Sequence, residues 1–269
     1  MPTIDGALFD IKKLDQLALG STAIHRLDPR AKVLATLFFI IAVISFGKYE
    51  LTALFPFFIF PVFLMTSGSL PVKYIAKKVL VVIPFALIIG IFNPVFDRTV
   101  LVHVGSVGIS GGWFSWASIM CRAVLSVGSA IILVGVTGFP AICSALERLG
   151  VPQTFALQLH FLYRYIFVLT EEGSRMAKAR ELRTFGSNGK GMKTFAAVIG
   201  SLLLRTWQRA ERIHMAMLAR GFNGDFHTRQ LFRFGRKEVS FLLIWTFVFI
   251  LMRLQNFPRL LGQFVTGLM

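Results

Sequence analysis

Five apolar stretches, three of them without a single charged side chain, limit what this chain can fold into. Hydrophobic residues make up 55% of the 269 residues and charged residues only 16%. In an ordinary soluble domain, about 25% of the residues are charged. Apolar runs of this kind are typical of helices buried in lipid. We therefore expect an all-α integral membrane protein with about five transmembrane helices, at residues 33–46, 51–66, 79–95, 113–138 and 239–256.

The expected spans are short or interrupted. At about 1.5 Å per residue, 33–46 falls short of a hydrocarbon core roughly 30 Å thick, which favours a short or mismatched helix. Pro56 and Pro61 in the second run and Pro84 in the third lack a backbone N–H, so we expect these helices to be kinked or partly unwound. Residues 96–112 form a polar, glycine-rich connection.

Isolated polar residues in the fourth run need a separate explanation. Arg122 at bilayer depth would cost at least about 2.5 kcal/mol, so it has to face protein, water or the interface. A functional arginine and one that snorkels to the interface both fit. Cys121 and Cys143 have neither a metal-ligand spacing nor a disulfide framework, so we expect small buried apolar side chains.

The basic residues set the expected orientation. A net charge of +16 would suggest a nucleic-acid partner for a soluble protein, but cytoplasmic loops of membrane proteins also accumulate Lys and Arg, so we expect no nucleic acid. A cytoplasmic N-terminus places most of this charge inside, and we expect no cleavable signal peptide.

The expected parts are a cytoplasmic N-terminal arm (1–32), a membrane domain of four spans (33–139), a cytoplasmic helical domain (140–237), and a final transmembrane helix and tail (238–269).

The cytoplasmic domain is expected to contain long helices. Residues 151–170 are half-apolar and predict either an amphipathic surface helix or a marginal span. Residues 171–185 and 192–221 predict two long helices, separated by the breaker at 186–189.

Two similar motifs lie forty positions apart in this domain: Ala179-Arg180-Glu181 and Ala219-Arg220-Gly221. Each closes a helix-like run, starts eight residues after a glutamate and is followed within a few residues by glycine. A helix that stops at glycine presents its last turn to whatever lies beyond it. Simple capping of the helix dipole would explain one such arginine, but the matched spacing of two favours a binding role.

The helix expected over 192–221 combines an apolar stripe with basic residues. The stripe residues recur mostly at three- and four-residue spacing: Phe195, Val198, Ile199, Leu202, Leu203, Thr206, Ile213, Met217 and Phe222. The arginines off the stripe are Arg205, Arg209, Arg212 and Arg220. Such a helix could lie on anionic lipid. Two helices with similarly placed arginines instead suggest a docking surface for a two-fold symmetric partner.

Patterns for catalysis or metal binding are missing from the sequence. It has no phosphate-binding glycine loop, no His-Glu-x-x-His run and no paired aspartates at membrane depth, and its five histidines occur singly. We therefore expect no catalytic residue and no metal site. A membrane-embedded enzyme acting on lipid or isoprenoid substrates would need an acidic Mg²⁺ site, for which Glu171 and Glu172 do not suffice. A self-sufficient carrier would need ionisable residues at midplane, where Arg122 is the sole candidate.

The paired motifs, with four apolar spans before them and one after, resemble the transmembrane scaffold (T component) of energy-coupling factor (ECF) transporters, the EcfT/CbiQ family. The run HRLDPRAK is similar to the family's opening motif. Within it, Asp28 is a natural N-cap for the following helix and Pro29 suits its first turn. The candidate scaffold motif comprises His25, Asp28, Pro29, Arg30 and Lys32. The arm with Asp15, Gly20, Ser21 and His25 most resembles the cobalt-type branch, CbiQ.

This resemblance implies a subunit without chemistry of its own. Arg180 and Arg220 would each contact one of two ABC-type ATPase subunits, which bind ATP and Mg²⁺, while this chain binds no cofactor. The same helices would support a substrate-binding membrane subunit, the S component, which captures Co²⁺ in the cobalt branch. A small accessory membrane subunit is a further candidate partner, and the expected location is the bacterial cytoplasmic (inner) membrane. Glu181 departs from the usual glycine of the first motif, and a nickel or vitamin scaffold is the alternative.

Overall fold

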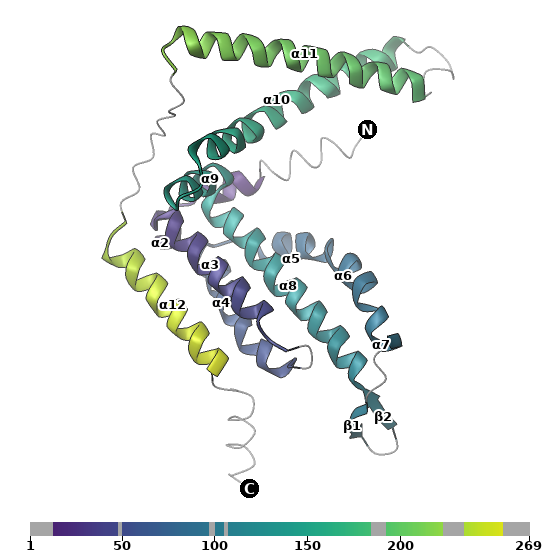
Figure 1. Cartoon of the computed structure of the whole chain (residues 1–269), viewed down its shortest axis with the longest axis vertical. Coiled ribbons are helices and arrows are strands. Elements are labelled where there is room, and N and C mark those ends of the chain that lie inside the picture. The colour runs from purple at the N-terminus through teal and green to yellow at the C-terminus, as the bar shows by residue number, and fades with distance from the viewer. Residues whose placement is uncertain are drawn as a thin grey trace. The chain divides into compact units, whose positions relative to one another are not determined.

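The computed structural model describes residues 13–47, 50–96, 100–104, 107–183, 192–222 and 234–254. The chain forms two compact units. The basic unit comprises Met1–Lys13 with Leu146–Leu231, and the apolar unit comprises Leu14–Ala145 with Phe232–Met269. Figure 1 labels the elements of both units.

All five apolar stretches of the sequence are largely helical in the apolar unit (Figure 1). The first forms α3, Pro29–Ile44, which is as short as expected. The fourth forms α8, Gly111–Thr137, and the last forms α12, Arg236–Leu254. The other helices are α2 (Ala23–Arg26), the 3₁₀ helix η1 (Thr52–Phe58), α4 (Ile59–Ser67), α5 (Val72–Leu80), α6 (Ile83–Gly90), α7 (Phe92–Phe96) and α9 (Phe139–Arg148), whose last residues belong to the basic unit.

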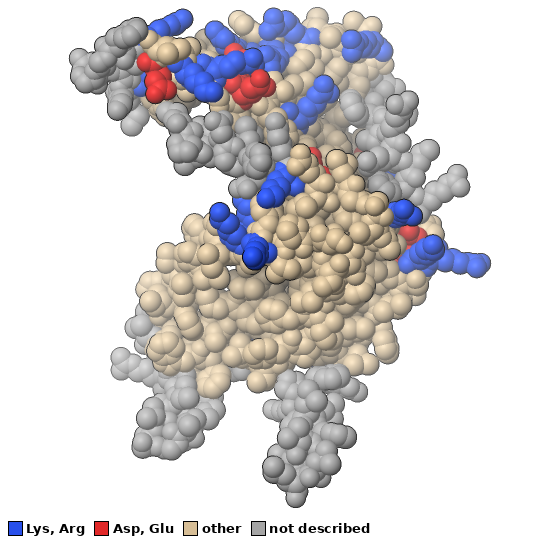
Figure 2. All heavy atoms as spheres, turned by 180° about the vertical axis from the view of Figure 1, so that it is seen from behind, with Lys and Arg blue, Asp and Glu red and all other residues tan. Residues whose placement is uncertain are grey.

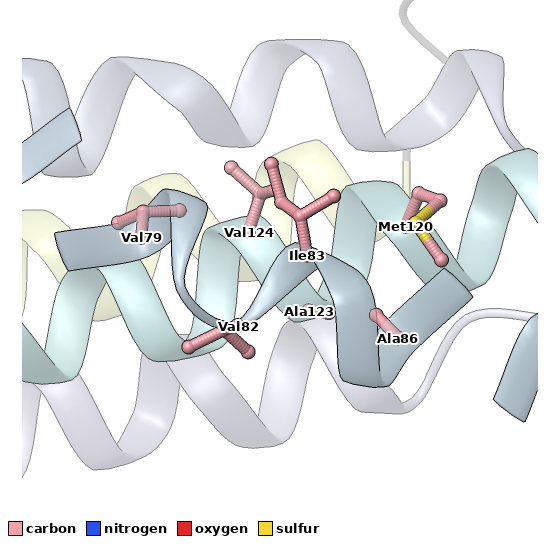
Figure 3. Close-up of a pocket in the computed structure, with 7 residues that line it drawn as sticks. All are labelled: Val79, Val82, Ile83, Ala86, Met120, Ala123 and Val124. Carbon is pink, nitrogen blue, oxygen red and sulfur yellow. The ribbon is translucent and has the colours of Figure 1, made fainter. Parts of the chain in front are cut away.

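The two proline-containing runs are interrupted, as predicted. Pro56 lies inside η1, and a regular α-helix, α4, begins only after it. Pro84 stands in the first turn of α6, after a turn in which Val82 N–H donates to Val79 O at 2.9 Å. Next to this break is a pocket lined by apolar side chains of α5, the turn, α6 and α8 (Figure 3). They are Val79, Val82, Ile83, Ala86, Met120, Ala123 and Val124.

An aromatic cluster holds α3, η1, α4 and α12 together. Its centre is Phe60 of α4, whose ring centroid lies 4.8 Å from that of Phe39, 4.9 Å from that of Trp245 and 5.2 Å from that of Phe249. Phe57 of η1 joins the same cluster, and Phe60 is only 1% exposed. Because the rings around Phe60 meet edge-on or tilted, their contacts add to the free energy of packing.

The short α3 also explains Arg122. This side chain, on α8, donates to Gly47 O just beyond the C-terminal end of α3. Arg253 of α12 donates to Ser45 O at 2.9 Å, forms an ion pair with Glu50 at 3.5 Å and lies over a phenylalanine ring. The two arginines therefore bind carbonyls that the end of α3 leaves without helical partners.

Among the residues that the structure describes, two helical segments, Val72–Pro94 and Gly111–Thr137, are long and apolar enough to cross a membrane, and the apolar helix Thr52–Ser67 is shorter. Large side chains of the first segment point outward, and Phe85, Ile88 and Ile89 are each more than 60% exposed. An apolar surface of this extent suits lipid better than water. The total of five spans and their orientation stay predictions.

The structure differs from the expectations at two places. The 96–112 connection contains an antiparallel hairpin of β1 (Val100–Val104) and β2 (Val107–Ser110), in which Val104 pairs with Val107. Alternating valines favour a strand there, although the glycines suggested a loop. In the basic unit, 151–170 and 171–185 form one helix, α10 (Gln153–Arg183), because the stretch within this helix has no proline and a single glycine.

Removing the centre of the aromatic cluster should weaken the apolar unit. We expect Phe60→Ala to cost about 3–5 kcal/mol, because it leaves a cavity among packed rings. The matched control is Phe55→Ala, since Phe55 is 61% exposed on η1. Thermal unfolding of the detergent-solubilised protein would show a clear drop in Tm for Phe60→Ala and little change for Phe55→Ala. Equal drops in Tm would contradict the role of the cluster.

Candidate functional site

Two long helices form the candidate site. They are α10 and α11 (Met192–Ala219), which contact each other in the basic unit (Figure 1). Figure 2 shows Lys and Arg side chains gathered over this unit, with few Asp and Glu among them. The helices share no deep core. Among their described side chains, Ala156 of α10 is buried and none of α11 is.

The contact between the helices combines an ion pair with apolar packing. Arg205 Nη1 of α11 lies 2.9 Å from Glu172 Oε1 of α10. Next to this pair, a Cβ atom at Gly173 would lie 3.8 Å from Leu202 Cδ2, an ordinary van der Waals distance. We call Glu172, Gly173, Leu202 and Arg205 the crossing.

The first predicted motif lies near the end of α10. Arg180 is in the last turn and half-buried, whereas Ala179 and Glu181 are exposed. The helix continues to Arg183, close to the predicted end at 185, so Ala179-Arg180 lies about one turn before the end of α10. Gly186, the expected breaker, lies outside the described residues.

The second motif ends α11, as predicted. Gly221 has a φ of +78°, and its N–H donates to Leu218 O at 2.9 Å while Phe222 N–H donates to Met217 O at 3.0 Å. This pair of bonds is a Schellman motif, which leaves Arg220 as the C-cap residue. Ala219, Arg220 and Gly221 are all exposed. Arg220 is therefore presented at the helix end.

The predicted apolar stripe of α11 is only partly covered. Its half-buried members are Val198, Leu202, Thr206, Ile213, Met217 and, just beyond the helix, Phe222. Its exposed members are Phe195, Ile199 and Leu203. The sequence reasoning missed a second exposed apolar face that comprises Leu204, Trp207, Met215 and Leu218. Glu211 and His214 interrupt that face in the sequence, which hid its three- and four-residue spacing.

The N-terminal motif ties α3 to α8 in the apolar unit. Asp28 Oδ1 accepts from Arg30 N–H at 2.9 Å and caps α3, and Pro29 is the first residue of that helix, both as predicted. Lys32 is buried, and its Nζ donates to Val136 O in the last turn of α8 at 3.5 Å. Asp28 Oδ1 and Lys32 Nζ are therefore bound within the apolar unit, and the scaffold role of the motif stays a prediction.

His25 forms hydrogen bonds with two other residues of the N-terminal arm. Its Nε2 donates to Leu17 O at 3.0 Å and its Nδ1 accepts from Thr22 Oγ1 at 2.7 Å, which fits the neutral ring. Partial burial lowers the pKa of His25, and the nearby charge of Lys32 acts in the same direction. Gly20 lets the ring lie close, because a Cβ there would come within 2.7 Å of it.

The described part of the chain contains no group of three or more His, Cys, Asp or Glu side chains that could hold a metal ion. The candidate site therefore has features for binding a partner, namely positive charge and exposed apolar side chains. Two arginines stand at or near the ends of two helices, beside exposed apolar side chains.

The Schellman motif should be sensitive to Gly221. With a Cβ, a residue at φ +78° is strained, so we expect Gly221→Ala to destabilise the end of α11 by about 1 kcal/mol. Gly200, inside α11, is the control. It also has open space around it, and Gly200→Ala should stabilise the helix by up to about 1 kcal/mol. Hydrogen exchange of the last-turn amides would report both effects, and faster exchange in both variants would argue against the motif.

Comparison with known proteins places this chain in a family. Residues 20–232 match the family model for CbiQ, described as cobalt transport protein. An energy-coupling factor transporter transmembrane protein, EcfT, of Ruminiclostridium cellulolyticum is 28% identical over 248 residues, which cover 84% of this chain and 90% of the relative. The EcfT of Listeria innocua is 28% identical over 220 residues, covering 76% and 82%.

An archaeal relative has a similar match. An uncharacterised protein of Methanocaldococcus jannaschii is 28% identical over 233 residues, 83% of this chain and 79% of the relative. The family match includes the N-terminal motif from Gly20 onward, the helical segments up to α11, and both arginine motifs. This chain therefore belongs to the CbiQ family of cobalt transport proteins.

Proposed function

We propose that this chain is the T component of an ECF-type ABC importer. It would be a transmembrane scaffold that couples ATP hydrolysis by a pair of ATPase subunits to a membrane subunit that captures the substrate. The family and the names of the EcfT relatives support this role. The observation that carries it is the placement of Arg180 and Arg220 near the ends of two helices that contact each other.

The helix ends suit docking to acidic partners. An arginine near a helix C-terminus can donate up to five hydrogen bonds in a planar fork, which matches a carboxylate in two-pronged geometry. Two such arginines from one chain can each enter an equivalent groove of a symmetric pair of ATPase subunits. The excess of Lys and Arg on the basic unit, visible in Figure 2, adds a longer-range attraction to such partners.

In this role, the chain transmits movement and performs no chemistry. ATP and Mg²⁺ would be held by the ATPase subunits, and their closure would displace α10 and α11 through the docked arginines. Helices of this length are stiff enough to carry that displacement to the substrate-capturing S component. The chain would cross the cytoplasmic membrane with about five spans and with its N-terminus inside.

Co²⁺ is the proposed cargo, captured by the partner subunit. The description of the family as cobalt transport proteins supports it. The relatives named EcfT bear no substrate in their names, so a nickel or vitamin importer is the second candidate.

Reversing the two motif charges should uncouple the transporter. In the complex purified from its native membrane, we expect Arg180→Glu/Arg220→Glu to lower the amount of bound ATPase subunits and coupled Co²⁺ uptake by about tenfold or more, because each introduced carboxylate would be repelled by an acidic groove. Co-purification, ATP hydrolysis and uptake of radioactive Co²⁺, with Ni²⁺ as competitor, would measure this.

The matched control is Lys178→Glu/Arg212→Glu. Both of these side chains are exposed on the same two helices, and the double variant changes the net charge by the same amount. We expect it to retain most of the bound ATPase. Normal transport in the Arg180→Glu/Arg220→Glu variant, or equal losses in both variants, would refute the assigned roles.

A further inference from the structure

The ion pair at the crossing has an unusual environment for a surface charge. The Glu172 side chain is 19% exposed, whereas Glu171, Arg175 and Arg205 are each more than 60% exposed. Glu172 Oε1 lies 2.9 Å from Arg205 Nη1, and its Oε2 lies 3.6 Å from Arg175 Nη2 on its own helix. The carboxylate therefore connects the two helices from a partly desolvated position, where its attraction to arginine is stronger than in water.

The packing between the two helices is shallow. None of the described α11 side chains is buried, and the least exposed apolar residues of its stripe, such as Val198, Leu202 and Ile213, are only half-buried. Shallow apolar packing restricts rotation only weakly, whereas an arginine and a carboxylate within hydrogen-bond distance constrain direction as well as separation. The ion pair thus contributes more to the angle between the helices than to the free energy of folding.

The crossing lies well short of both arginine motifs along the helices. Arg180 follows Glu172 by eight residues, or about 12 Å of helix, and Arg220 follows Arg205 by fifteen, or about 22 Å. A rotation of about 10° at the crossing would therefore displace Arg220 by about 4 Å. Such a shift exceeds the tolerance of a hydrogen-bonded arginine, because a displacement of about 1 Å already breaks good geometry.

We propose that Glu172 and Arg205 are positioning residues that set the separation of the two arginine motifs. The inference rests on the proposed function, in which Arg180 and Arg220 dock two ATPase subunits at once. Glu172 and Arg205 touch no partner in this role. They hold α10 and α11 at the angle that lets both motifs engage together.

A distance measurement tests the geometry directly. Spin labels at Leu182→Cys and Leu218→Cys, both exposed near the helix ends, would report the separation in the full chain with Cys121 and Cys143 replaced by alanine. We expect Glu172→Arg to shift the mean distance by several ångströms and to broaden it, because the introduced guanidinium would repel Arg205. The reversed pair, Glu172→Arg/Arg205→Glu, should restore a narrow distribution close to the original.

Glu171→Arg is the control, because it makes the same charge change one residue away, at a side chain that contacts Arg175 of its own helix. It should leave the distance unchanged. The assembled complex gives the second readout: coupled ATP hydrolysis should fall at least about fivefold in Glu172→Arg and recover in the reversed pair. Size-exclusion chromatography of each variant confirms that the chain is folded.

The outcomes separate the two proposals. An unchanged distance in Glu172→Arg overturns the positioning role, and so does a shifted distance with fully coupled hydrolysis. A wild-type chain that carries no ATPase subunits refutes the proposed function. In that case, the distance measurement alone decides whether the pair fixes the crossing.

Discussion

Close packing of short helices against α8 is the constraint on which the apolar unit depends. Helices α3, α4, α5, α6 and α7 all contact α8. Most of its buried positions carry small residues: Gly111, Gly112, Ser115, Ser118, Gly128, Ser129 and Gly135. In lipid, helices associate by close van der Waals packing rather than by the hydrophobic effect, so small side chains are what allow the backbones to approach. The neighbouring helix α6 also packs closely on α8, since a Cβ at Gly90 of α6 would lie 2.9 Å from Trp116 of α8.

Short helices leave backbone groups to be satisfied by their neighbours. Lys32, near the start of α3, donates to the last turn of α8, and Arg122 of α8 donates to Gly47 O just past the other end of α3. Arg253 adds a bond to Ser45 O from α12. Unpaired carbonyls in an apolar surrounding are costly, and these cations lower that cost. Gly47 O also accepts from Glu50 N–H at 3.2 Å. The positions of Arg122 and Arg253 are thereby accounted for by the shortness of α3.

Local signals made much of this predictable, and tertiary contacts account for the rest. Asp28, Pro29 and Gly221 act through their own backbone geometry, so the sequence alone indicated the start of α3 and the end of α11. The partner of Arg122 depends on a residue 75 positions away, and the crossing joins residues 33 apart. Nothing in the spacing of charges along one helix reveals which carboxylate meets which arginine on another. For the same reason, the sequence did not indicate the contact of Glu172 with Arg205, because Glu172 is there only one of two adjacent glutamates.

The two units therefore obtain order from different sources. The apolar unit has an aromatic cluster and a close-packed α8, whereas the 28-residue α11 presents Trp207 at 72% exposure and has no buried side chain among those described. Most helical stability in proteins comes from tertiary packing, so a helix of this kind gains order from what binds it. A large core between α10 and α11 would fix them permanently. The crossing at Glu172 and Arg205 instead lets the helices keep a defined angle without burying the described side chains of α11, as the proposed coupling role requires.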